Sequence, residues 1–231
     1  MKILGLIPAR GSSKGIPNKN RKELGGKPLL QYTIEAALGA QLLDDVVFSS
    51  EDTELISLAK QMGATVTFKR PNHLASDTAG SLEVVQHALE SLAEQGMKYD
   101  AICLLQVTTP FRTSEDIDEA ISKFIERGTD SLISVQKVPH QYNPHWVFEV
   151  NNNDLKIATG EAKIIKRRQD LPNTFIRDGA IYITKSDIIL KQGSFFGESI
   201  SHIELDAQRY VNIDTPEDWT KAEEIYKKLY F

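Results

Sequence analysis

The sequence predicts an α/β protein built on an open, mostly parallel β-sheet with helices on both faces. Short apolar segments alternate along the chain with longer segments whose apolar residues recur at helical spacing. The fourth apolar segment, 100–106, is an almost continuous apolar run. Such runs are typical of an interior strand that helices cover on both faces. Together, the alternation and this run favour a layered α/β fold over an all-helical or all-β one.

The expected elements follow one another in a regular order. The strands are short apolar runs, expected at 2–7, 45–50, 64–68, 100–106, 130–138, 179–184, 199–205 and 210–214. The long helices are amphipathic segments, expected at 28–40, 52–62, 81–95 and 114–127, with a short helix after 179–184 and a final helix from Thr215. Three helices are followed by Gly63, Gly96 or Gly128, and glycine readily adopts the left-handed conformation that ends a helix. Pro28 stands near a helix start, where its missing N–H costs little.

The alternation stops after Val138. Segment 138–176 is instead typical of hairpins and turns, and 151–154 (NNND) is expected to form a tight turn. We interpret this segment as an insertion within a single domain spanning 1–231, because the length suits one large domain.

Composition excludes several classes of protein. The chain carries a net charge of −5, whereas a nucleic-acid binder usually presents a broad basic surface. No segment approaches the ~20 apolar residues of a membrane span, and the apolar run 3–7 is too short for a signal peptide. We therefore expect a cytoplasmic protein with no nucleic-acid or membrane partner. The single cysteine, Cys103, lies in an apolar run and is expected to be buried, reduced and inert.

Positive charge is concentrated in one loop. Residues 1–22 contain six basic and no acidic side chains, and the segment IPARGSSKGIPNKN (7–20) places Arg10, Lys14 and Lys19 among glycines and prolines. Such a backbone can approach a ligand closely, and a local cation cluster suits a compact anion such as a phosphate chain. A solvated basic turn is the alternative. Because the loop matches neither the P-loop nor the G-x-G-x-x-G pattern, we expect side chains and loop amides, more than a helix dipole, to bind the phosphates.

The sheet is expected to bring this loop close to distant parts of the chain. Ligands of open α/β sheets bind outside the carboxyl ends of the strands. The loop 7–20 follows the first strand, 106–110 follows the fourth, and Asp214 ends the last. These three parts should therefore lie near a common edge.

Six segments resemble, in order, the CMP-sugar synthetases that activate nine-carbon acidic sugars. They are IPARGSSKGIPNKN, KRPNHLASDTAGS, LLQVTTPFR, RRQDLP, DGAIYIT and NIDTPEDW. The first and fourth are fairly specific for the CMP-N-acetylneuraminate synthetases (acylneuraminate cytidylyltransferases) and their legionaminate and pseudaminate relatives. LLQVTTPFR and DGAIYIT also resemble wider groups of nucleotidyltransferases. The resemblance implies a Rossmann-like sheet of the nucleotide-diphospho-sugar transferase type and a β-rich insertion, 138–176, that mediates homodimerisation.

The resemblance also implies an activity and a nucleotide site. Family members transfer CMP from CTP to the anomeric hydroxyl of a nonulosonic acid, release pyrophosphate and use Mg²⁺. By the same resemblance, the triphosphate would be contacted by residues of the basic loop, namely Arg10, Ser13, Lys14, Lys19 and Asn20. The cytosine would be held by Arg70, Ala79 and Ser81. From the residues alone, Arg70 could instead form a surface salt bridge, and Ser81 could cap the helix that follows it.

The sugar contacts implied by the resemblance are Gln106, Arg168, Gln169 and Asp170. An arginine fork suits the carboxylate of an acidic sugar. Which cation of the run 166–168 would reach the substrate is left open, and Asp170 could simply pair with a neighbouring arginine.

Asp214 is the metal ligand that we expect, with Asn212 beside it. Hard oxygen ligands suit Mg²⁺. Relatives often carry two aspartates here, so Asn212 removes one charge. Asp214 could alternatively belong only to a helix start in which Thr215 is the cap. Arg10, Lys19 and Asp214 are the expected catalytic residues, and the general base is unassigned, with Asp214 a candidate through a bound water.

Three rival functions stay open. The acid could be 3-deoxy-manno-octulosonate, or the substrate could be a sugar 1-phosphate. The chain could also be a nucleotide-binding module without turnover, which only Asn212 favours. The preferred nonulosonic acid cannot be chosen among neuraminate, legionaminate, pseudaminate and deaminated neuraminate.

Overall fold

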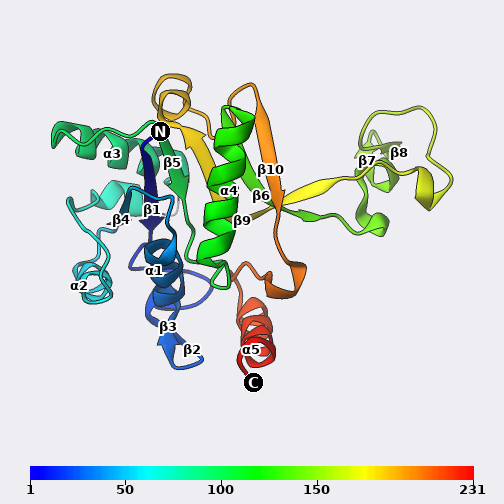
Figure 1. The fold of residues 1–231 in the computed structure, drawn as a ribbon. Helices are drawn as coiled ribbons and strands as arrows, with labels where there is room; N and C mark the ends of the chain where they lie inside the picture. The colour runs from blue at the N-terminus through cyan, green and yellow to red at the C-terminus, as the bar shows by residue number, and fades with distance from the viewer. Residues whose placement is uncertain (77) are drawn as a thin grey trace.

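A six-stranded sheet forms the centre of the protein in the computed structural model, which describes residues 1–76 and 78–231 (Figure 1). Asp77, within the second family motif, lies outside the described residues. The strand order is β10-β6-β9-β5-β1-β4. The strands are β1 (Ile3–Pro8), β4 (Asp45–Ser49), β5 (Ala101–Leu104), β6 (Ser131–Lys137), β9 (Phe175–Lys185) and β10 (Ile200–Glu204).

The sheet is mostly parallel, as the sequence predicts. β1 runs parallel to β4 and β5, and β10 runs parallel to β6. β9 is the exception, because it pairs antiparallel with both β5 and β6. The expected strand 179–184 is part of this longer β9, so residues 175 and 176 belong to the sheet and not to the insertion.

Helices cover both faces of the sheet. They are α1 (Leu29–Gly39), α2 (Thr53–Gln61), α3 (Ser81–Glu94), α4 (Ser114–Arg127) and α5 (Pro216–Tyr230). Successive residues of a strand point to opposite faces. Ile3 and Ile7 of β1 accordingly join one apolar cluster, which includes α1 and α4, whereas Leu4 and Leu6 join a second cluster built against α3. The predicted fold class is therefore confirmed.

Several smaller elements complete the fold. Two hairpins stand apart from the main sheet, formed by β2 (Glu23–Leu24) with β3 (Lys27–Pro28) and by β7 (Phe148–Asn151) with β8 (Asp154–Ile157). The single-turn helices are η1 (Lys19–Arg21), η2 (Asn72–Ala75), η3 (His140–Tyr142), η4 (Pro144–Trp146), η5 (Arg168–Asp170), the π-helical η6 (Ile188–Gln192) and η7 (Ala207–Arg209). Among the described residues, no helix combines the length and the apolar character needed to cross a bilayer.

The prediction of two strands, at 64–68 and 210–214, is wrong. Segment 64–68 makes only a single bridge, between Thr65 and Val47, before Phe68 turns to pack against the cluster under α3. Segment 210–214 is buried in part but does not pair with a strand. The backbone N–H of Ile213 donates to the carbonyl of Thr108 in a loop, at 2.8 Å, and the carbonyl of Ile213 accepts from a lysine side chain. The apolar pattern correctly indicated burial, but these hydrogen-bond partners lie outside the sheet.

The segment after β6 projects beyond the sheet as an arm that carries the β7–β8 hairpin (Figure 1). Asn152 and Asn153 connect the two strands with φ values of 51° and 68°. Two successive left-handed residues are typical of a type I′ turn, which asparagine tolerates better than most residues. The tight turn expected at 151–154 is therefore confirmed.

Cys103 should be unreactive in the folded protein. Its side chain is fully buried in β5, and burial raises the pKa of its thiol to about 12. Because the thiolate is the reactive form, we expect no labelling by Ellman's reagent at pH 8 until denaturant unfolds the chain. Labelling measured against denaturant concentration should follow the unfolding transition. Rapid labelling of the native protein would contradict this burial.

Candidate active site

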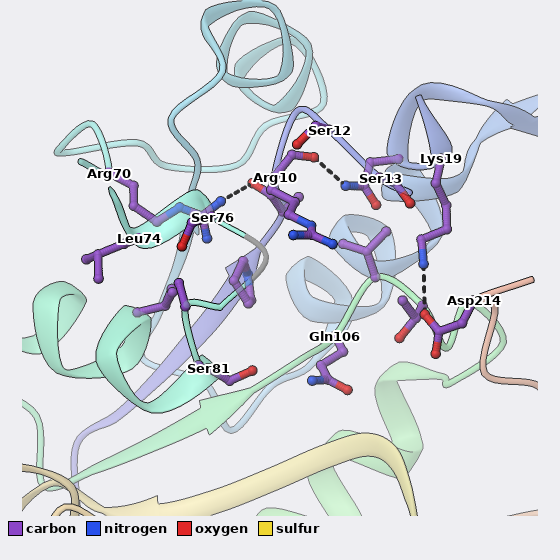
Figure 2. Close-up of a pocket in the computed structure, with 18 of the residues that line it drawn as sticks. Arg10, Ser12, Ser13, Lys19, Arg70, Leu74, Ser76, Ser81, Gln106 and Asp214 are labelled. Atoms are coloured by element: carbon purple, nitrogen blue, oxygen red, sulfur yellow. Dashed lines mark hydrogen bonds and ion pairs between the residues drawn. The ribbon is translucent and has the colours of Figure 1, made fainter. Parts of the chain in front are cut away.

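A cavity of about 340 Å³ opens at the carboxyl end of β1 and β5 (Figure 2). It is formed by parts of the chain that the sequence scatters. The site residues expected from the sequence that line it are Arg10, Ser13, Lys19, Asn20, Arg70, Ala79, Ser81, Gln106, Asn212 and Asp214. The edge of the sheet therefore assembles the basic loop, the expected base pocket and the expected metal ligands around one space.

The basic loop that follows β1 is fixed by hydrogen bonds near both ends and by a buried side chain in its middle. The backbone N–H of Ala9 donates to the carbonyl of Ser49 at 3.0 Å, which extends the pairing between β1 and β4. Ile16 is buried and anchors the loop in the core. The side-chain amide of Asn20 donates to the carbonyl of Arg10 at 2.8 Å. The loop is thus held in a fixed shape, with the Arg10 side chain in the cavity (Figure 2).

Lys19 connects this loop to the segment before α5. Its side chain is nearly buried, with 8% of the residue exposed. The ammonium group donates to the carbonyl of Ile213 at 2.6 Å and to Oδ1 of Asp214 at 3.0 Å. These contacts hold a positive charge at the cavity wall, where it can attract a phosphate group.

Asp214 and Asn212 lie together in the cavity. The side-chain amide of Asn212 donates to Oδ2 of Asp214 at 2.8 Å, and 60% of the Asp214 side chain is exposed. The helix start expected after Asp214 is also present, because Thr215 and Asp218 form a capping box for α5. The backbone of Asp214 takes part in it by donating to Asp218 at 3.0 Å, which leaves its carboxylate directed to the cavity.

This donor set suits a hard cation. Each carboxylate oxygen of Asp214 accepts one hydrogen bond here and has a further lone pair. Asn212 adds a carbonyl oxygen. Mg²⁺ is typically bound through one or two carboxylates together with substrate phosphates and water. The residues therefore fit a magnesium ion that a triphosphate helps to hold.

Gly15 packs directly against the carbonyl oxygen of Asp214, so that no side chain fits between them. We expect Gly15→Ala to displace the loop from Asp214 and to lower kcat/KM for CTP by about 10²-fold, because small misplacements of catalytic groups are costly. The melting temperature should change little, because Gly15 is exposed. Steady-state kinetics and thermal melts test this. Unchanged kinetics would show that the contact does not position the loop.

Arg70 forms the opposite wall. Its residue is only 4% exposed, and Nη2 donates to the carbonyl of Ala9 at 2.8 Å and to Oε2 of Glu51 at 2.6 Å. The surface salt bridge considered from the sequence is thus a buried ion pair beside the cavity. Ser81 also lines the cavity and does not cap α3, because the N-cap position belongs to Gly80.

Gln106 is positioned by two features that the sequence did not predict. Gly179 of β9 has φ +81°, and a Cβ there would lie 3.1 Å from Oε1 of Gln106, so a glycine lets the strand pass close to this side chain. Arg112 is buried and donates to the carbonyls of Gln106, at 2.7 Å, and Ala180, at 3.2 Å. Burial lowers the pKa of Arg112 to about 10. The arginine of LLQVTTPFR thus braces the loop that carries Gln106.

Four expected site residues lie outside this cavity. Lys14 is exposed and is not part of the lining. Arg168, Gln169 and Asp170 form η5 on the arm, and Arg168 lines a different hollow at its base. Asp170 pairs with Arg167, with Nε to Oδ2 at 2.7 Å, as the alternative reading of this residue allowed. Within one chain, the fold separates η5 on the arm from this cavity.

Other cavity residues were not predicted, although some signals were present. Ser12 lies within the loop motif, and Ser76 and Gly80 belong to the motif that contains Ala79. Glu51, two residues after the end of β4, is not part of the lining but contacts both Arg70 and the backbone of the loop. The rule that ligand sites lie at carboxyl ends of strands, applied to the second strand, would have indicated it.

Comparisons with known proteins agree with this geometry. The sequence model of a family described as "Cytidylyltransferase" matches residues 4–231. The pseudaminic acid cytidylyltransferase of Campylobacter jejuni is 36% identical over 227 residues, which cover 98% of this chain and 97% of the relative. The CMP-N,N'-diacetyllegionaminic acid synthase of Legionella pneumophila is 32% identical over 236 residues, covering 97% and 96%.

A solved structure shares the fold. It is a CMP:2-keto-3-deoxy-manno-octonic acid synthetase complexed with CTP, which superposes with a TM-score of 0.74 over 99% of this chain and 100% of that one, at 17% identity. The resemblance seen in the six motifs is confirmed by the matches along nearly the whole sequence. The chain belongs to the cytidylyltransferase family.

Proposed function

We propose that this protein transfers CMP from CTP to the anomeric hydroxyl of a nonulosonic acid and releases pyrophosphate. The observation that carries the proposal is the single cavity that brings the cationic loop, the Arg70 wall and Asp214 together. The names of the relatives at 36% and 32% identity support acids of the pseudaminic and legionaminic type as acceptors. We also propose that the reaction takes place in the cytoplasm, where CTP is available.

The geometry supports a single in-line displacement. The anomeric oxygen of the sugar forms a bond to the α-phosphorus of CTP, and the bond from that phosphorus to the bridging oxygen of pyrophosphate breaks. The proton of the anomeric hydroxyl passes to a base, for which Asp214 through a bound water is the candidate. Arg10 and Lys19 lie where cations can offset the charge that builds on the departing pyrophosphate. Gln106 provides an amide for the sugar hydroxyls at the same cavity.

Magnesium would be held by Asp214 and the carbonyl oxygen of Asn212. When bound, it would neutralise phosphate charge and polarise the α-phosphate. Lys19, bonded to the same Asp214 carboxylate, keeps that group directed toward the cavity.

The test is pyrophosphate release from CTP with a panel of acid sugars, beginning with pseudaminic and legionaminic acids and including neuraminic acids. We expect release with at least one nonulosonic acid and its loss when EDTA removes the metal. Release only with 3-deoxy-manno-octulosonate or with a sugar 1-phosphate would replace this function by one of its rivals. Binding of CTP without release for any acceptor would favour a module without turnover.

The arm is proposed to form a homodimer. Val150 and Leu155 on its hairpin are 74% and 67% exposed, and Phe148 and Ile164 are exposed as well. An apolar patch of this kind suits a protein partner. A partner chain seated on the arm would also explain how Arg168 can serve a cavity that lies away from it in its own chain. Sedimentation velocity should give a dimer, and a purely monomeric protein at assay concentrations would reject the proposal.

A further inference from the structure

Glu51 lies just outside the cavity and joins two segments of the chain that line it. It lies two residues after the end of β4, and its two carboxylate oxygens have different partners. Oε1 accepts from the backbone N–H of Gly11 in the basic loop at 2.7 Å, and Oε2 accepts from Nη2 of Arg70 at 2.6 Å. One side chain therefore joins the loop on the phosphate side to the arginine on the base side.

The loop fits closely against the segment that carries Glu51. A Cβ at Gly11 would overlap the carboxylate of Asp52, so only glycine allows the loop backbone to reach Glu51. Asp52 is itself fixed, because it caps α2 and pairs with Arg21. Glu51 thus belongs to a rigid wall and not to a flexible surface loop.

The guanidinium of Arg70 is hydrogen-bonded through Nη2 but not through Nε. Its Nη2 is occupied by Glu51 and by the carbonyl of Ala9, whereas its buried Nε has no hydrogen-bond partner among the described residues. Because this Nε has almost no accessible surface, a ligand in the cavity that Arg70 lines would meet the guanidinium through its other nitrogens.

Charge alone cannot explain a glutamate in this position. The cavity is expected to bind a polyanion, and a carboxylate beside it repels phosphate. Removing that charge would by itself strengthen anion binding. A positioning role predicts the opposite, because the loop amide and Arg70 would lose their common support.

We propose that Glu51 is a positioning residue that fixes Arg70 and the phosphate loop together, and thereby sets both the preference for cytosine and the affinity for the triphosphate. The inference rests on the proposed CTP site. Cytosine presents an acceptor at N3, whereas uracil carries a hydrogen there. A guanidinium held in one place by Glu51 can favour the first base and reject the second.

The test measures binding without the sugar, by isothermal titration calorimetry with magnesium, for CTP, UTP and inorganic tripolyphosphate. The variants are Glu51→Gln, Arg70→Ala and the double variant. Glu54→Gln is the matched control, because Glu54 is exposed and pairs with Arg21 instead of with Arg70. Circular dichroism checks folding. If Glu51→Gln does not fold, Glu51→Asp takes its place, because a shorter carboxylate cannot span both partners.

We expect Glu51→Gln to lower the preference for CTP over UTP by about tenfold and to weaken tripolyphosphate binding by about fivefold, the size typical of a lost charge-assisted hydrogen bond. Arg70→Ala should lower the preference for CTP over UTP without weakening tripolyphosphate binding. The double variant should lower that preference no further than Arg70→Ala does. Glu54→Gln should match the wild type.

Three results would overturn the proposal. They are an unchanged preference in folded Glu51→Gln, tighter binding of tripolyphosphate by that variant, and a wild-type chain that does not bind CTP. A wild-type chain that binds CTP with this dependence on Glu51 but releases no pyrophosphate with any nonulosonic acid would refute the acceptor chemistry and leave Glu51's role intact.

Discussion

Replacing Arg10 with alanine is expected to lower CMP transfer by about 10²–10³-fold while the protein stays folded, which is the usual effect of removing one group that stabilises transition-state charge. The Arg10 side chain lies in the cavity on a loop that Asn20 and Ile16 hold in place. The hydrogen bond from Asn20 goes to the Arg10 backbone, so the substitution leaves the loop's support intact. The measurement is kcat/KM for CTP with the best acceptor from the panel.

Two further variants show whether the loss is due to the charge, the geometry or the mere removal of an arginine. Arg10→Lys keeps the charge but loses the fork geometry, so an intermediate loss is expected. Arg127→Ala, at the exposed end of α4, is the matched control for removing an arginine and should leave turnover unchanged. Wild-type turnover by folded Arg10→Ala would defeat the proposed phosphate role of the loop.

Asp214→Asn and Asn212→Asp are expected to act in opposite directions on magnesium. Asp214→Asn removes the only carboxylate of the pair, so kcat should fall by about 10²–10³-fold, and more magnesium should be needed for half-maximal turnover. Asn212→Asp adds a second carboxylate two residues away, so less magnesium should be needed. Magnesium titrations of the initial rate measure both effects.

A control separates the metal from the ion pair with Lys19. Asp187→Asn breaks another aspartate–lysine pair, with Lys191 at 2.8 Å, on an exposed turn, and should alter neither kcat nor the magnesium requirement. Lys19 keeps its bond to the Ile213 carbonyl in Asp214→Asn, so melting temperatures should stay close to wild type. If both cavity variants had the wild-type magnesium requirement, Asp214 and Asn212 would not be the metal ligands.

Most of the cavity could be predicted from the sequence for two reasons. Its segments have recognisable local patterns, and the topology of a parallel sheet predicts that they meet at one edge. The basic loop is recognisable by its charges and glycines, and parallel strands bring their carboxyl ends to one edge. Glu51 was missed because a glutamate after a strand resembles any exposed acid. Its significance depends on Gly11 and Arg70, which lie 40 and 19 residues away in the chain.

The sequence alone determined the alternation of elements, the burial of Cys103 and the family motifs, because apolar periodicity and short-range turn chemistry are properties of neighbouring residues. Only the tertiary structure decided which polar groups meet. It showed that the extended segments 64–68 and 210–214 do not become strands, that Lys19 reaches Ile213 and Asp214, and that η5 lies on an arm outside the cavity. Hydrogen bonds between distant residues depend on how the layers pack, and no local pattern in the chain records that packing.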